Sequence, residues 1–453
     1  MLLKRENCLS RIRPFYKADI IKILTGSRRA GKSKVIELII KELKDAGVKD
    51  KDIIYINFED LKYDEIDDYK KLNDFVLKHK GNGKQYLFFD EIQHVSSFEK
   101  AINSFRVSFD CSIFITGSNS KMLSTEISTL LTGRIVEFNI YPFTFNESNE
   151  YLKLNQRSEI DFNNYLRLGG YPLRLEINNE KAERDYLNEL FDNICQKDIF
   201  VRDSEIEKNK FIKIAKYVLL NAGCDFNPEK IYNYLKTENG GKEYCALSSI
   251  YNYLEKMEMS FLIKPIYRYN ITGKTMLKSN PKYYAIDNGM RYICSNGNNY
   301  DRGKFLENVV LLELLSRDYE VFVGKTYKGE VDFVATKNGK KCFIQVALTM
   351  EQQETIDREF NAFSPIKDGS PKYVISLDRV DMSRDGITHL NVIDFLLGKV
   401  ELYISWCITL VVCTPDFLQI CLTLIANTQS LITVLIQFGT VFISFKFDLR
   451  FAC

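Results

Sequence analysis

The segment ADIIKILTGSRRAGKSKVIELIIKEL, residues 18–43, places a glycine-rich turn between an apolar strand and an amphipathic helix. The turn, residues 26–33, matches the pattern G-x-x-x-x-G-K-[ST] at every fixed position. Backbone N–H groups at such a strand-to-helix turn converge on phosphate oxygens. We therefore predict a phosphate-binding loop that takes ATP.

Each residue type in the turn has a role in this prediction. Glycine at positions 26 and 31 permits backbone angles and close approaches that a Cβ would block. Lys32 is expected to bridge the β- and γ-phosphates, and the Ser33 hydroxyl to take one coordination position of Mg²⁺. Arg28 and Arg29 either shield phosphate charge or are simply solvated. The predicted phosphate-binding residues are Gly26, Ser27, Arg28, Arg29, Ala30, Gly31, Lys32 and Ser33.

Hydrolysis also requires a carboxylate for the metal and a base for water, and the strand QYLFFDEIQ supplies both. It ends in Asp90 and Glu91, which is the Walker B arrangement. We expect Asp90 to hold Mg²⁺ through water and Glu91 to orient and deprotonate the lytic water. An acidic pair at a strand end is common on protein surfaces, but its combination with the phosphate-binding loop favours catalysis.

Two further polar positions are candidates for contact with the γ-phosphate. The strand SIFITGSNS ends in Thr116, Ser118 and Asn119, where a polar side chain could contact the γ-phosphate or the lytic water. We favour Asn119 over Ser118, and a strand-to-helix turn with capping hydroxyls is the alternative. Arg134, in LLTGRIVEF, is a candidate for neutralising transition-state charge in its own or a neighbouring subunit. A surface arginine at a strand start is equally consistent with the pattern.

The periodicity of the chain predicts an α/β protein with a parallel sheet, a helical and winged-helix middle region, and a small α/β unit at the end. Apolar strands alternate with helices first, helical spacing then dominates, and three short helices precede a hairpin. The expected domains are 1–145 (ATPase), 146–210 (helical linker), 211–290 (winged helix), 291–398 (compact α/β) and 399–453 (apolar tail).

These motifs resemble the AAA-type ATPases of bacteria and archaea that carry a C-terminal domain of uncharacterised function. The resemblance extends over nearly all of residues 11–398, through segments such as YLRLGGYP, DNICQKDIF, KYYAIDNGMRY and GKFLENVVLLEL. It implies ATP and Mg²⁺ as ligands, a winged-helix linker, and a terminal unit similar to restriction endonucleases of the PD-D/E-x-K class. It does not imply a biological role.

The nuclease-like unit departs from that pattern at one strand. Glu307 and Asp332 supply carboxylates, but Gln345 and Ala347 stand where glutamate and lysine are needed to hold a metal and balance charge. We therefore expect a catalytically degenerate unit. The alternative function is an ATP-gated DNA-binding or nuclease module of a defence system, in which Glu307, Asp332 and Gln345 converge on a metal.

Nucleic acid is a possible partner through the hairpin, residues 264–282. Its basic side chains occur without an acidic residue from 259 to 286, so a basic wing lying along a phosphate backbone is one interpretation. A solvated hairpin that docks between domains is the other. The basic residues are Lys264, Arg268, Lys274, Lys278 and Lys282.

Composition limits the remaining possibilities. A chain of 453 residues with 62 basic and 60 acidic side chains is globular and nearly neutral, so any charged partner must be recognised locally. Eleven cysteines without a C-x-x-C pair, and only three histidines, argue against zinc sites and a disulfide framework. We expect a cytoplasmic protein, an unidentified protein partner and possible oligomers.

The tail is different from the rest of the chain. Between residues 402 and 444 the only charged side chain is Asp416. A membrane anchor, an added buried sheet and sequence unrelated to the family are the three interpretations, and we favour the last. Truncation near residue 399 is then expected to leave ATP binding unchanged.

Overall fold

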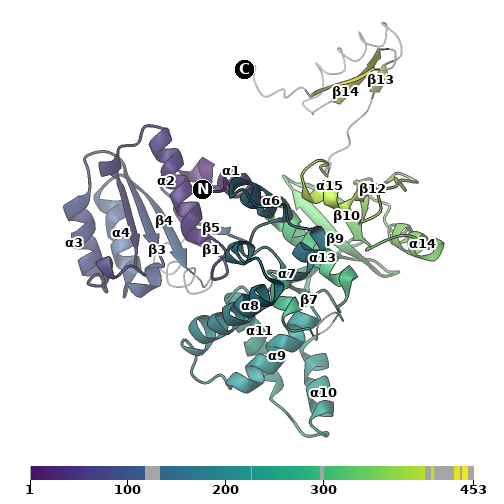
Figure 1. The fold of residues 1–453 in the computed structure, drawn as a ribbon, viewed down its shortest axis with the longest axis horizontal. Helices are drawn as coiled ribbons and strands as arrows, with labels where there is room; N and C mark the ends of the chain where they lie inside the picture. Colours follow the sequence, from purple (N-terminus) through teal and green to yellow (C-terminus); the bar gives the residue numbers. More distant parts are fainter. Residues whose placement is uncertain are drawn as a thin grey trace.

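The computed structural model describes residues 2–117, 133–225, 227–295 and 300–402, together with strands at 410–412, 433–438 and 441–446. The chain forms two units, of which the first holds the N-terminal sheet and the second holds the helical region and the C-terminal sheet (Figure 1). The first unit contains a five-stranded parallel sheet in the order β2-β3-β4-β1-β5. Its strands are β1 (Ile21–Thr25), β2 (Ile53–Asn57), β3 (Gln85–Asp90), β4 (Cys111–Gly117) and β5 (Ile135–Asn139).

Helices cover both faces of this sheet. The apolar sides of α1 (Glu6–Ile12) and α2 (Lys32–Asp45) pack on one face, around Leu24, Phe88 and Phe114. Helices α3 (Tyr69–His79) and α4 (Phe98–Ser108) pack on the other. Strand β4 lies between β1 and β3, so the phosphate-binding loop and the acidic pair end on strands that are not neighbours. This order is typical of P-loop NTPases.

A helical region follows the first sheet and lies between the two sheets in Figure 1. A π-helical segment, Cys195–Phe200, continues α8 toward the first unit. The helices are α6 (Phe145–Leu154), α7 (Phe162–Leu168), α8 (Glu180–Ile194), α9 (Lys208–Leu220), α10 (Pro228–Glu238) and α11 (Leu247–Met259).

The C-terminal part is built on a seven-stranded mixed sheet in the order β12-β11-β10-β9-β8-β6-β7. Helix α13 (Arg302–Ser316) packs on one face of this sheet, and α14 (Gln353–Asn361) packs on the other. The short helices α12 (Asn288–Tyr292) and α15 (Val392–Leu396) belong to the same core as α13. The strands are β6 (Ile263–Asn270), β7 (Thr275–Ala285), β8 (Glu320–Lys325), β9 (Glu330–Lys337), β10 (Lys340–Val346), β11 (Lys372–Ser376) and β12 (Ile387–Asn391).

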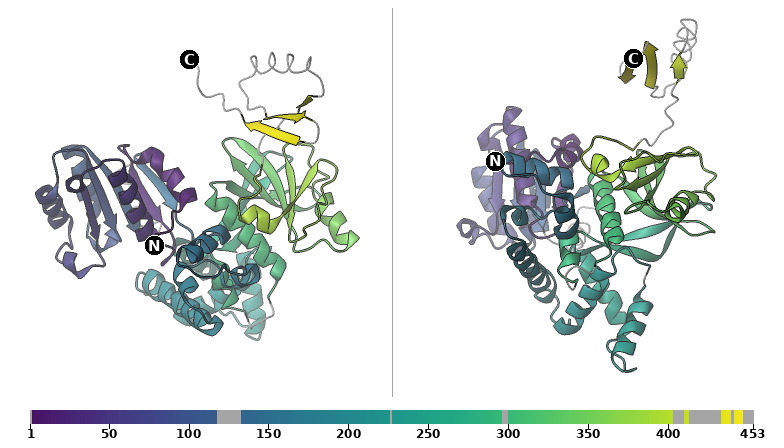
Figure 2. Two further views of the ribbon diagram at one scale, coloured as in Figure 1. Left: turned by 45° about the horizontal axis from the view of Figure 1, so that its top comes forward. Right: turned by 45° about the vertical axis from the view of Figure 1, so that its right-hand side comes forward.

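The predicted α/β class is confirmed, with its parallel sheet, helical middle region and second α/β unit. Of the two interpretations of the hairpin β6–β7, the structure favours a docked hairpin over a free wing. Strand β6 pairs in parallel with β8, with Arg268 opposite Val323, so the hairpin is the edge of the C-terminal sheet. That sheet therefore runs across residue 290, where the sequence predicted a boundary. One hydrophobic core, reaching from Phe145 to Leu402, joins the helices to the sheet (Figure 2).

The apolar tail contributes a separate three-stranded sheet of β13 (Leu410–Val412), β14 (Thr433–Phe438) and β15 (Val441–Lys446). Most of the region in which the sequence suggested a membrane anchor lies outside the described residues. Within the residues that the structure describes, no helix combines the length and the apolar composition that crossing a bilayer requires.

Candidate nucleotide-binding site

The predicted phosphate-binding loop connects β1 to α2 with backbone angles that require glycine. Gly26 has a φ of 150°, and a Cβ there would lie 2.2 Å from the carbonyl oxygen of Ile140. Gly31 has a φ of 97° and precedes the first residue of α2, Lys32. The first N–H groups of α2 lie outside the helical hydrogen-bond ladder, and no side chain caps this end. Such an end suits an anion.

Lys32 lies across this loop and faces the acidic pair of β3. Its Nζ donates to the carbonyl oxygens of Gly26 (3.0 Å) and Ser27 (3.3 Å), and it is 3.8 Å from Oε1 of Glu91. The ammonium group is almost fully buried. Because its two hydrogen-bond acceptors are neutral carbonyls of the loop itself, a phosphate oxygen can replace them at little cost.

Asp90 is fully buried between two hydroxyl groups at the end of β3. Thr116, at the end of the adjacent strand β4, donates its hydroxyl to Oδ1 of Asp90, and Tyr55, on β2, donates to Oδ2 at 3.2 Å. Burial and the neighbouring Asp90 carboxylate raise the pKa of Tyr55, so its phenol remains a donor. The carboxylate is therefore held in one orientation, and Thr116, which the sequence placed among the candidates for contact with the γ-phosphate or the lytic water, binds the acidic pair instead.

Glu91 has a left-handed backbone, with a φ of 55°, which is a sparsely populated conformation for a residue with a side chain. Its N–H donates to the Thr116 hydroxyl at 2.9 Å, and its Oε2 accepts from Nε2 of Gln93 at 2.5 Å. The sequence analysis overlooked Gln93, although it follows in the same DEIQ segment. Its position two residues after Glu91 was the available signal.

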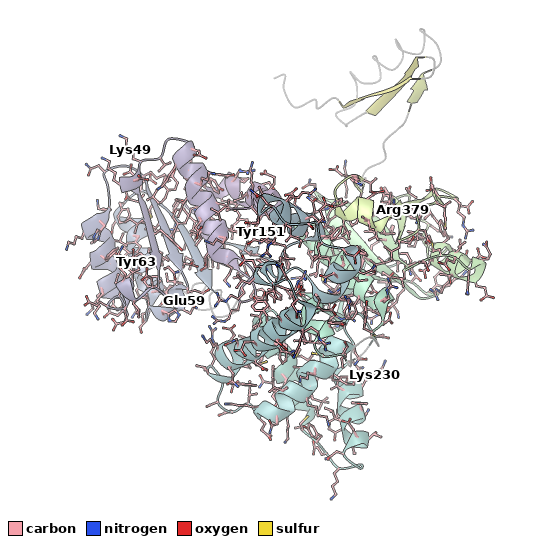
Figure 3. The ribbon with its side chains drawn as sticks, viewed as in Figure 1. Lys49, Glu59, Tyr63, Tyr151, Lys230 and Arg379 are labelled. Atoms are coloured by element: carbon pink, nitrogen blue, oxygen red, sulfur yellow. The ribbon has the colours of Figure 1, made fainter. Side chains whose placement is uncertain are left out.

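The helical region also contacts the loop, through residues that sequence reasoning missed. Tyr171 is fully buried and donates its hydroxyl to Oγ of Ser27 at 3.0 Å. Asp198, in the π-helical segment, accepts from Arg28 at 2.9 and 3.2 Å. Although burial lowers the pKa of Arg28, pairing with Asp198 raises it overall. Glu59, labelled in Figure 3, lies 3.7 Å from the same guanidinium. Arg28 is thus an ion-pair partner rather than a solvated side chain.

The turn before Tyr171 requires glycine at the first two positions of the GGYP segment. A Cβ on Gly169 would lie 1.9 Å from Oδ1 of Asp287, and a Cβ on Gly170 would lie 1.9 Å from the carbonyl oxygen of Phe143. Asp287 accepts a hydrogen bond from the N–H of Gly170 at 2.7 Å. Burial raises the pKa of Asp287 to about 6. The hydrogen bond between Tyr171 and Ser27 of the loop is therefore linked, through the turn at Gly169 and Gly170, to Asp287, the residue that caps α12.

Arg5, which the sequence motifs do not single out, also contacts the loop. This buried guanidinium donates to the carbonyl oxygen of Ala30 at 3.2 Å and to that of Tyr141 at 2.9 Å. It also pairs with Glu147 through two hydrogen bonds of 3.0 Å. Glu147 belongs to the capping box that begins α6, so Arg5 connects the loop to the helical region.

Some predicted site residues are not brought to the loop. Arg134 is exposed just before β5, beside Ile21 at the start of β1, while the loop follows the other end of β1. A five-residue strand separates the two by roughly 15 Å, so the structure contradicts a role for Arg134 within its own subunit. Ser118 and Asn119 lie outside the described residues. Ser33 is half-buried in the first turn of α2 and Arg29 is exposed, with a φ of 67°.

The C-terminal sheet carries a second cluster of carboxylates and lysines. Glu307 accepts from the hydroxyl of Tyr284 and from Nζ of Lys304, both at 2.6 Å. Asp332 accepts from the N–H of Val346 at 2.8 Å, and Gln345 accepts from the N–H of Asp332 at 3.2 Å. Burial, and then Glu307, raise the pKa of Asp332 to about 7. Both oxygens of Glu307 and Oδ2 of Asp332 thus accept hydrogen bonds from the chain itself, and Lys304 neutralises Glu307.

The basic hairpin is partly buried, which favours the docked hairpin over the basic wing among the two interpretations of its sequence. Arg268 and Lys282 are 7% and 6% exposed, and both pair with Glu330 on β9, Lys282 at 3.0 Å. Arg268 also pairs with Asp225 at 2.7 Å. Because these cations neutralise neighbouring carboxylates, they are not available to a phosphate backbone. Lys274, at the tip, is exposed.

Comparison with known sequences agrees with this geometry. Residues 18–149 match a family described as an AAA domain, and residues 159–300 match a domain of unknown function, DUF8612. An uncharacterized protein of Haemophilus influenzae is 34% identical over 408 residues, which cover 87% of this chain and 99% of the relative. The chain belongs to this AAA-domain family. Its member MJ1544 of Methanocaldococcus jannaschii, an uncharacterized protein, is 33% identical over 381 residues, covering 80% of this chain and 81% of that protein.

Among solved structures, the AAA-domain chain is similar to the Walker-type ATPase PABY2304 of Pyrococcus abyssi. The similarity covers 64% of this chain and 95% of that structure, with 18% sequence identity and a TM-score of 0.46.

Proposed function

We propose that this protein is an Mg²⁺-dependent ATPase in which Lys32, Ser33, Asp90 and Glu91 perform the chemistry. The observation that supports this most is the distance of 3.8 Å between Nζ of Lys32 and Oε1 of Glu91. This contact brings the phosphate-binding loop, which follows β1, next to the acidic pair at the end of β3, although β4 lies between the two strands. Asp90, oriented by Thr116 and Tyr55, stands next to Glu91. These are the parts that phosphoryl transfer to water requires.

The chain's own residues have distinct tasks in this proposal. The loop N–H groups and Lys32 hold the triphosphate, and Ser33 and Asp90 hold the magnesium ion, which neutralises charge on the phosphates when bound. Glu91 takes the proton of the attacking water, and its carboxylate is oriented by the amide of Gln93 at 2.5 Å. Arg134 can contribute only to a neighbouring subunit's site.

Two substitutions test the catalytic assignment. We expect Lys32→Ala to abolish ATP binding, and Glu91→Gln to retain binding while turnover falls about 100-fold or more. Fluorescent-nucleotide titration and phosphate release measure the two effects, with Glu65→Gln, an exposed glutamate of the same unit, as the matched control. Normal hydrolysis by Glu91→Gln would show that another group is the base.

We also propose that the nucleotide state is passed to the C-terminal part for use on a protein partner. Phosphate at the loop competes with Asp198 for Arg28 and changes the surroundings of Ser27, to which Tyr171 is bonded. Hydrogen exchange in residues 195–200 should therefore change when an ATP analogue binds. In Asp198→Asn, the analogue should still bind but this change should be reduced; an undiminished change would contradict the route.

A further inference from the structure

The tips of three loops of the C-terminal sheet enclose an open pocket of about 460 Å³. The loops are the β6–β7 turn, the β8–β9 turn and the segment that follows α14. Lys274, Tyr327 and Lys367 line the pocket, one from each loop. Lys328 is adjacent to Tyr327, with its Nζ 5.9 Å from the centre of the tyrosine ring. This set of three lysines and one tyrosine is called the tip cluster below.

The tip cluster carries uncompensated positive charge. Its three lysines are exposed, and among the described residues none of them has an ion-pair partner within 4.0 Å. Two carboxylates beside these loops are already neutralised: Glu330, which follows the β8–β9 turn, pairs with Arg268 and Lys282, and Asp368, which lines the pocket, pairs with Lys341 at 2.7 Å. The buried cations of the hairpin thus remove the negative charge that would otherwise offset the tip.

Tyr327 adds an aromatic surface to this charge. Its side chain is 76% exposed, which is unusual for a residue of this size. The turn that carries it is closed by hydrogen bonds from the N–H and the hydroxyl of Thr326 to the carbonyl oxygen of Gly329, at 2.8 and 3.1 Å. At the facing tip, the N–H of Gly273 donates to Oδ1 of Asn270 at 2.9 Å. The tips are therefore ordered before any ligand binds.

From this arrangement we propose that the tip cluster binds single-stranded nucleic acid. Lysines with no carboxylate partner bind phosphates, and an exposed ring beside them stacks on an unpaired base. A duplex buries its base faces and offers only the phosphates, and an acidic peptide offers no base at all. The site shares Lys274 with the hairpin considered in the sequence analysis, but its other residues come from two different loops, and it does not depend on ATP hydrolysis.

The test uses fluorescence anisotropy of the full chain with a labelled 20-nucleotide oligothymidylate, over a range of salt concentrations. We expect Lys274→Glu/Lys328→Glu/Lys367→Glu to weaken binding at least tenfold and to reduce the salt slope by about 2, because each single-strand phosphate contact contributes about 0.7. Tyr327→Ala should weaken binding about tenfold and leave the slope unchanged, since it removes stacking and not charge.

The matched control is Lys49→Glu/Lys51→Glu/Lys78→Glu, which makes the same change in charge on exposed lysines of the ATPase unit; Lys49 is labelled in Figure 3. Unchanged thermal unfolding confirms that each variant is folded. Equal affinity of the tip and control variants would overturn the proposal, as would absence of binding at 50 mM salt. Equal binding of a duplex of the same length, or equal competition by polyglutamate, would overturn the assignment to single strands.

Discussion

The two sheets of this protein each place lysines beside carboxylates, but they do so in different ways. At the end of β3, Lys32 is 3.8 Å from Glu91 and is hydrogen bonded only to neutral carbonyls. In the C-terminal part, Lys304 pairs with Glu307 on the same helix, α13, at 2.6 Å, and Lys282 on β7 pairs with Glu330 on β9 at 3.0 Å. The first arrangement keeps a cation available for a ligand, whereas the second consumes its cations in the folded chain.

This difference explains why residue types alone do not identify a site. Both clusters contain a buried carboxylate beside a lysine, Glu91 after β3 and Glu307 on α13. What separates them is whether the chain supplies its own counter-charge. A buried pair that loses one partner leaves an uncompensated charge. Substitutions in the second cluster should therefore lower the stability of the fold, whereas substitutions in the first should weaken ligand binding.

The largest effect is expected for Lys304→Met. Removing this cation leaves the Glu307 carboxylate, whose side chain is 4% exposed, without its ion-pair partner. The free energy of unfolding should fall by about 3–5 kcal/mol, while the affinity for nucleotide stays the same. Urea denaturation measures the loss, and Lys340→Met, at an exposed lysine of the same sheet, is the control. A variant as stable as the control would mean that the two clusters do not differ as described.

A smaller effect, on turnover, is expected for Gln93→Ala. Loss of the amide that donates to Glu91 should lower kcat about tenfold with KM nearly unchanged, because the carboxylate is no longer held for the attacking water. In the Glu91→Gln background the same substitution should have little further effect, as expected for two residues that act together. Independent effects of the two substitutions would exclude this positioning role.

A third buried lysine sharpens the comparison through pH. Lys22 donates to the Ser112 hydroxyl at 2.6 Å and to the carbonyl oxygen of Ala18 at 3.3 Å, and burial lowers its pKa to about 7. Between pH 7 and 10 the unfolded chain keeps this proton while the folded chain releases it, so stability rises with pH. From pH 7 to 9 the contribution is about 2 kcal/mol. Lys22→Met should remove this rise, as measured by denaturation at both values; an identical rise in the variant would contradict the assignment.

The smallest effect is expected on removing the tail. Leu402 packs in the core of the C-terminal part and is 5% exposed, so the structure moves the truncation point from residue 399 to residue 402. A chain that ends after Leu402 should bind ATP as the full chain does, because neither cluster contains tail residues. Loss of nucleotide binding, measured by titration, would show that the tail supports the first unit.

The sequence predicts the first site well because its main residues lie in two short segments. Glycine spacing identifies the loop, and an apolar run ending in two acids identifies β3. Tyr171 and Asp198 escape such reasoning because they reach the loop from 144 and 170 residues away. Arg5 is likewise defined by partners 25 to 142 residues distant.

The density of basic residues along the chain predicted the structure less well than the spacing of the motifs did. The hairpin is free of acidic residues along the chain, yet Arg268 and Lys282 face Glu330, which only the pairing of β8 with β6 brings to them. Burial of a charged side chain depends on such long-range pairing, and local sequence does not record it. For the same reason the sequence left both a basic wing and a docked hairpin open.

The continuity of the core from Phe145 to Leu402 constrains how the protein can respond to its ligand. Helices that share side-chain packing with a sheet resist moving separately from it. ATP-driven displacement between the two units would then act on the contacts that join them, which are those of Arg5, Tyr171 and Asp198 and the ion pair of Arg11 with Asp318 at 2.8 Å. A change of a few degrees there would swing the distant strand tips through a much larger arc.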